Sequence, residues 1–74
     1  MTMHTITIEV YDGNGGWREW RTRRMSNEHN AAEWIARVDA RIDENYGNLW
    51  PRRILHNGQS VTELELFQRM VEVE

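Results

Sequence analysis

Residues 30–47, NAAEWIARVDARIDENYG, decide the fold, because their apolar residues recur at the spacing of one helix face. That apolar face comprises Ala31, Trp34, Ile35, Val38, Ile42 and Tyr46. We expect Asn30 to act as the N-cap and Glu33 to stand where a capping box places its carboxylate, and Gly47 suits a helix end. We therefore predict a helix over 30–46 whose apolar face the rest of the chain must cover.

Length and composition restrict the class of protein. The chain has 74 residues, a net charge of −3 and no cysteine. We expect one small domain over 1–74 with a thin core. Small secreted domains usually carry disulfides, so the lack of cysteine favours the cytoplasm. No apolar run reaches membrane-spanning length and no targeting pattern begins the chain, so no membrane partner is expected.

The segment before the helix is typical of a β-hairpin over 4–25. Ile6, Ile8 and Val10 alternate with polar residues, as in a strand with one buried face. Residues 12–16, DGNGG, are rich in the glycines that tight turns need. We therefore expect two antiparallel strands that pack one face against the helix.

The pairing of these two strands determines which face each tryptophan takes. If Tyr11 pairs with Trp17, then Trp20 lies on the inner face of the sheet. Arg21 and Arg23 then lie on the outer face. A slip of one residue would exchange the two tryptophans between the faces.

Residues 52–68 are predicted to form a second hairpin, with residues 47–51 as the linker from the helix. The dipeptide Asn-Gly at 57–58 is a strong signal for a two-residue turn. Pairing around this turn places Arg52 opposite Glu63, and such opposite charges attract across a sheet.

A second helix is the alternative for the last part of the chain. It would begin at Ser60 or Thr62, because residues 65–70 are mostly good helix formers. We favour the strand because Thr62, Leu64 and Leu66 alternate along it and agree with the turn.

The predicted fold class is α+β, with a small antiparallel sheet of three to four strands. The order is ββαββ, and one amphipathic helix packs on one face of the sheet. The predicted core comprises Ile6, Ile8, Val10, Trp20, Trp34, Ile35, Val38, Ile42, Leu55, Leu64 and Leu66.

Catalytic and metal-binding patterns are missing from the sequence, so we predict no catalytic residue, cofactor or metal. His4, His29 and His56 lack the spacing of a zinc site, and we expect all three on the surface. The chain has no lysine for Schiff-base or phosphate-binding roles. A non-enzymatic function is therefore expected.

Acidic residues form the first predicted contact surface. Asp39, Asp43 and Glu44 lie towards the C-terminal end of the predicted helix, where the helix dipole disfavours acids. Glu63 and Glu65 share one face of the predicted last strand. These acids are either a solvated surface or a surface kept for a partner with a basic surface.

Arginine and tryptophan form the second predicted contact surface, in residues 17–24. Trp17 is followed on the same strand by Arg21, Arg23 and Arg24. The arginines either pair with nearby acids, bind an acidic protein or bind nucleic acid. The sequence pI of about 5.6 argues against nucleic acid.

The layout resembles small phage-encoded inhibitors of bacterial defence, the anti-CRISPR proteins. The likeness rests on a short acidic chain, a β-hairpin with a helix, and the five acids just named. It implies that acidic side chains mimic phosphates and occlude a basic groove on a defence complex. The arginine-rich strand departs from a pure nucleic-acid mimic, so a direct protein–protein plug fits better.

The resulting prediction is a non-enzymatic protein-binding module, an inhibitor that occludes its partner's surface. The first alternative is a nucleic-acid-binding protein that uses residues 17–24. The second is a homodimeric adaptor that pairs through an exposed strand edge.

Overall fold

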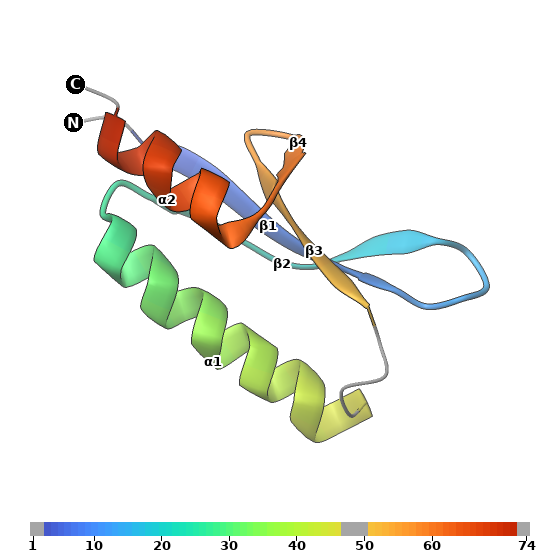
Figure 1. Ribbon diagram of the computed structural model, residues 1–74. Coiled ribbons are helices and arrows are strands. Elements are labelled where there is room, and N and C mark those ends of the chain that lie inside the picture. The colour runs from blue at the N-terminus through green and yellow to red at the C-terminus, as the bar shows by residue number, and fades with distance from the viewer. Residues whose placement is uncertain (1–2, 47–50, 73–74) are drawn as a thin grey trace.

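The fold consists of one sheet and two helices in a computed structural model that describes residues 3–46 and 51–72. The elements are β1 (His4–Tyr11), β2 (Trp17–Met25), α1 (Glu28–Tyr46), β3 (Arg52–His56), β4 (Gln59–Val61) and α2 (Glu63–Glu72). The antiparallel sheet has the strand order β2-β1-β3-β4 (Figure 1). The α+β class is confirmed. The ββαββ order with a single helix is wrong, because α2 follows β4.

Both helices pack on the same face of the sheet, so the core is a single layer between sheet and helices (Figure 1). Ile6, Ile8 and Val10 project from β1 into this layer and are fully buried. The helix residues in the same cluster are Ala31, Trp34, Ile35, Val38 and Ile42 from α1 and Leu66 and Met70 from α2. The predicted apolar face of α1 is therefore the one that covers the sheet, and within residues 3–46 and 51–72 no helix covers the opposite face.

Two members of the predicted core, Leu55 and Leu64, lie outside the core cluster, whereas Trp20 is partly buried and packs against it. Leu64 is 67% exposed, and Leu55 and Trp20 are only partly buried. Leu55 pairs with Thr7 on the uncovered face of the sheet. The core residues that the prediction omitted are Met25, Ala31, Val61 and Met70.

The segment from Thr62 onward forms α2 rather than a strand, so the second hairpin ends at Val61 and not at residue 68. The Thr62 hydroxyl accepts a hydrogen bond from the Glu65 backbone N–H at 3.1 Å. The Glu65 carboxylate accepts one from the Thr62 N–H, also at 3.1 Å. This capping box satisfies two backbone donors and starts the helix, which removes Glu63 from its predicted place opposite Arg52.

Helix α1 begins earlier than predicted. The side chain of Asn27, not that of Asn30, caps it, because Asn27 Oδ1 accepts a hydrogen bond from the Asn30 N–H at 3.0 Å. The helix extends to Tyr46, as predicted. The predicted helix end at Gly47 and the linker through residue 50 lie outside the described residues.

A β-bulge changes the predicted pairing of β1 with β2. Tyr11 pairs with Trp17 as predicted, but the register shifts between Ile8 and Glu9, and Ile8 pairs with Arg21 instead of Trp20. Trp20 is the extra residue and packs against the core. Beyond the bulge Arg23 pairs with Ile6, so Arg21 and Arg23 lie on the helix-covered face. Their predicted place on the outer face is wrong.

Two of the three histidines are buried, contrary to the expected surface positions. His4 and His56 are 3% and 7% exposed, and His4 Nδ1 lies 2.7 Å from His56 Nε2. Arg69 of α2 approaches the other ring nitrogen of His56 at 3.3 Å. The guanidinium can only donate, so His56 Nδ1 accepts and His56 Nε2–H donates to His4. These three residues join α2 to β1 and β3.

Candidate functional site

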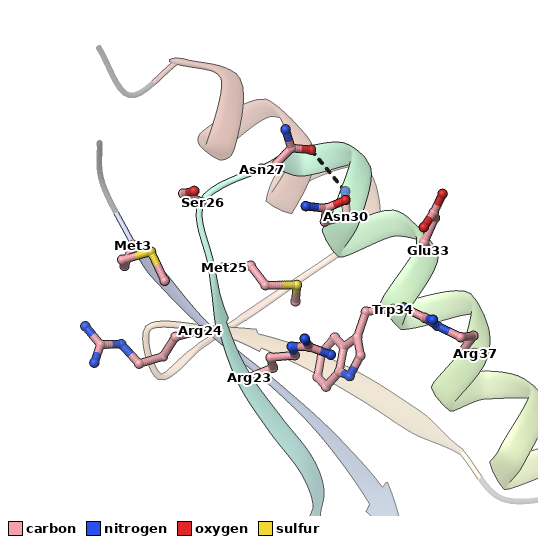
Figure 2. A pocket seen from close by; sticks show the side chains of 10 residues that line it. All are labelled: Met3, Arg23, Arg24, Met25, Ser26, Asn27, Asn30, Glu33, Trp34 and Arg37. Carbon is pink, nitrogen blue, oxygen red and sulfur yellow. Dashed lines mark hydrogen bonds between the residues drawn. The ribbon is translucent and has the colours of Figure 1, made fainter.

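A groove between β2 and α1 brings four arginines together. Arg21 and Arg23 come from β2, Arg37 and Arg41 from α1, and all four are exposed. Trp20, Trp34, Val38 and Glu44 also line this hollow of about 450 Å³. We call it the arginine groove. It continues towards the start of α1, where Arg23 and Trp34 project between β2 and the helix (Figure 2).

Local structure explains why arginines from two elements meet here. The bulge at Trp20 places Arg21 and Arg23, rather than Thr22 and Arg24, on the helix-covered face. On α1, Arg37 and Arg41 are one helical turn apart and follow the buried residues Trp34 and Val38 by three positions. They therefore lie beside the buried stripe rather than on the far side of the helix.

The groove arginines lack acidic partners in the described part of the chain. Arg21 donates to the Trp20 carbonyl oxygen at 2.7 Å, and its guanidinium lies 5.1 Å from the centre of the Trp20 ring. Among residues 3–46 and 51–72, no carboxylate lies within ion-pair distance of Arg23, Arg37 or Arg41. Their charge is available to an external anion.

Glu33 on α1 could neutralise the positive charge of Arg37 but contacts a histidine instead. It is one helical turn from Arg37, a spacing at which opposite charges usually attract. Its carboxylate instead lies 3.3 Å from Nε2 of His29, in the preceding turn.

The aspartates of α1 have an internal partner. Arg52 of β3 contacts Asp43 at 2.9 Å and Asp39 at 3.5 Å, and it also donates to the Asp39 carbonyl oxygen at 3.2 Å. Arg52 lies on the helix-covered face because it pairs with Val10. This contact gives Asp39 and Asp43 a structural role in holding α1 against β3.

The other predicted acids do not form one surface. Glu44 lines the arginine groove, whereas Glu63 and Glu65 are in the first turn of α2. Acids in a first helical turn are stabilised by the helix dipole, and Glu65 also closes the capping box. Their predicted shared face on a strand is wrong, because they are helical.

Trp17 lies on the uncovered face of the sheet, away from the groove. Arg24 pairs with Thr5 on the same face and lines only the hollow at the start of α1. Figure 2 shows Arg24 projecting to the opposite side of β2 from Arg23. The Trp17 ring lies 4.5 Å from the guanidinium of Arg53 and makes an edge contact with Tyr11. Arg53 in turn donates to Glu9 at 2.8 Å. The Trp17 ring is therefore already in contact with two side chains of this protein, Tyr11 and Arg53.

Two of the four groove arginines, and Glu44, were predicted from the sequence as contact residues. Arg21 and Arg23 were predicted contact residues, but Arg37 and Arg41 were not. The helical spacing of Arg37 and Arg41 beside the apolar stripe is the signal that could have found them. Which strand faces this side of the helix cannot be read from that spacing.

Within residues 3–46 and 51–72, no group of three or more histidine or acidic side chains could hold a metal ion. Neither α1 nor α2 has the length and apolarity needed to cross a bilayer. No protein-family model, curated protein or solved structure matches the sequence or the fold.

Proposed function

We propose that this protein is a non-enzymatic binding module that occludes an acidic segment of a partner protein with its arginine groove. The observation that carries the proposal is the gathering of four exposed arginines in a hollow where Glu44 is the one acid among the described lining residues. Glu33 lies beside the continuation of the groove and contacts His29. A guanidinium binds a carboxylate through two parallel hydrogen bonds, and such charge-assisted bonds are the stronger kind. An acidic peptide segment would satisfy these donors.

The tryptophans favour a protein partner over single-stranded nucleic acid. Base stacking requires an open aromatic face. Trp34 is buried, and the Arg21 guanidinium covers the Trp20 ring. Arg53 and Tyr11 contact Trp17 on the opposite face of the sheet. The net charge of −3 also weakens attraction to a polyanion.

Because the acids make contacts within the chain, we expect the partner's surface to be acidic and not basic. An inhibitor that mimics phosphates would need Asp39 and Asp43 free, yet both contact Arg52. Glu65 is used to cap α2. The occluding role suggested by the likeness to anti-CRISPR proteins is retained in the proposal, with an acidic rather than a basic partner surface.

A titration with three ligands tests the proposal. A glutamate-rich peptide, a neutral peptide of the same length and a single-stranded oligonucleotide, each fluorescently labelled, are compared by anisotropy at low and high salt. We expect the acidic peptide to bind more tightly than the other two ligands, and its affinity to fall as the salt concentration rises. No binding of the acidic peptide at low salt, or tighter binding of the oligonucleotide, would overturn the proposal.

Charge reversal locates the binding surface. We expect Arg23→Glu and Arg37→Glu each to lower the affinity for the acidic peptide by about tenfold or more. Each substitution removes a hydrogen-bond donor and adds charge repulsion. Arg18→Glu is the matched control, since Arg18 is an exposed arginine of β2 that does not line the groove. An equal loss in the control would show that overall charge, and not the groove, governs binding.

A further inference from the structure

Strand β2 is an edge of the sheet with one neighbour, β1. It has nine residues, and all except Trp20 and Met25 are exposed. In the described part of the chain, no backbone hydrogen bond joins its outer edge to another segment. A strand edge of this kind can pair with an extended chain through its free N–H and C=O groups.

We infer that the partner's acidic segment binds as an added β-strand on the outer edge of β2, with acidic side chains at alternate positions. This inference rests on the proposed function and specifies its geometry. An extended chain presents alternate side chains to the same face of a sheet. On the helix-covered face these side chains would lie beside Arg21 and Arg23, with Arg37 and Arg41 across the groove.

Charge complementarity selects an acidic segment over a second copy of this chain. Residues 21–25, which follow the bulge, contain Arg21, Arg23 and Arg24 and no acid. Two copies paired through β2 would bring these arginines close to one another, and like charges on neighbouring strands are destabilising. The same charges attract a strand that carries acids. The charge of this edge therefore disfavours pairing with a second copy and favours pairing with an acidic strand.

The bulge sets the part of β2 on which the added strand would lie. Its pairs with β1 are uninterrupted from Arg21 to Met25, whereas the register shifts at Trp20. A bulge bends the strand and disrupts regular pairing. The added strand is therefore short and centred on Arg23, the arginine that lies between β2 and α1 in Figure 2.

N-methylated peptides separate strand addition from simple charge attraction. The parent is a short peptide that alternates glutamate with threonine. Two derivatives carry N-methyl groups on the two alternate sets of backbone amides, so both retain the parent's charges. Only one set can donate to β2 in an added strand. We expect one derivative to bind about tenfold more weakly than the parent and the other to bind almost as well.

The outcomes distinguish this inference from the proposed function. Equal effects of both methylation patterns, with the parent still bound and still sensitive to Arg23→Glu, would overturn strand addition and leave the proposed function standing. No binding of the parent or of any other acidic peptide would overturn both. Dimers of the protein alone at low concentration would assign the edge to a second copy and also overturn the inference.

Discussion

At the scale of single residues, His56 links the stability of the protein to pH. Burial lowers the pKa of His56 from its ordinary value of 6.5, and the neighbouring His4 and Arg69 lower it further. A proton on Nδ1 would remove the acceptor for Arg69 and place two positive charges side by side. The neutral ring is therefore the form that holds α2 to the sheet.

We expect the protein to lose stability as the pH falls through about 6.5. The pKa of His56 is lower in the folded state, so the unfolded state binds more protons in this range, and stability rises with pH. Thermal unfolding followed by circular dichroism between about pH 8 and pH 5 measures the slope. Asp12 does not interfere, because backbone hydrogen bonds from Gly15 and Asn14 lower its pKa from 3.8.

The variant His56→Gln tests the assignment of this slope. Glutamine retains a donor and an acceptor but does not titrate, so we expect the pH dependence to become shallower. His29→Gln is the matched control, because His29 lies on the exposed side of α1. If the slope were the same in His56→Gln as in the unsubstituted protein, another group would be responsible for it.

At the scale of elements, α2 shows how one sequence pattern can fit two structures. Thr62, Leu64 and Leu66 alternate as in a strand, yet the same stretch contains a capping box between Thr62 and Glu65. The predicted strand rests on the alternation and is wrong, because the capping box starts a helix directly after Thr62. In the helix Leu64 is exposed and Leu66 is buried, so the two substitutions should differ in their effect on stability.

We expect Leu66→Ala to destabilise the protein by about 2–5 kcal/mol, because Leu66 is fully buried and its loss leaves a cavity. Leu64→Ala, the matched control on the same helix, should change the stability by no more than about 0.5 kcal/mol, because Leu64 is exposed. Chemical denaturation of both variants measures the difference. Similar losses for the two would indicate a strand with both leucines on one face.

The elements that could be predicted are those whose local signals agree. Helix α1 has a sustained helical spacing, and β1 combines alternation with β-branched residues, so both were found. The cap of α1 is Asn27 and not the predicted Asn30. The bulge in β2 had no local signal, because it depends on how Trp20 packs against a core built by other elements. The groove depends on that bulge. For this reason the sequence named Arg21 and Arg23 but assigned them to the wrong face.

At the scale of the whole molecule, charge is distributed unevenly, so that one surface is positive although the net charge is negative. The chain carries −3 overall, yet the arginine groove is positive and lies beside an open strand edge. Of the acids elsewhere, Asp39 and Asp43 contact Arg52, and Glu63 and Glu65 lie in the first turn of α2. The uncompensated positive charge is thus concentrated where the sheet could be extended.

We expect the protein to be a monomer and the double variant Arg21→Thr/Arg23→Thr to dimerise. The substitution removes like-charge repulsion from β2 and adds residues that favour strands, so the edge can pair with a second copy. Light scattering after size exclusion, over a range of concentrations, measures the mass. Arg37→Thr/Arg41→Thr is the matched control, because it removes the same charge from α1 without changing the edge. A dimeric unsubstituted protein, or equal dimerisation of the control, would show that the arginines of β2 do not protect this edge.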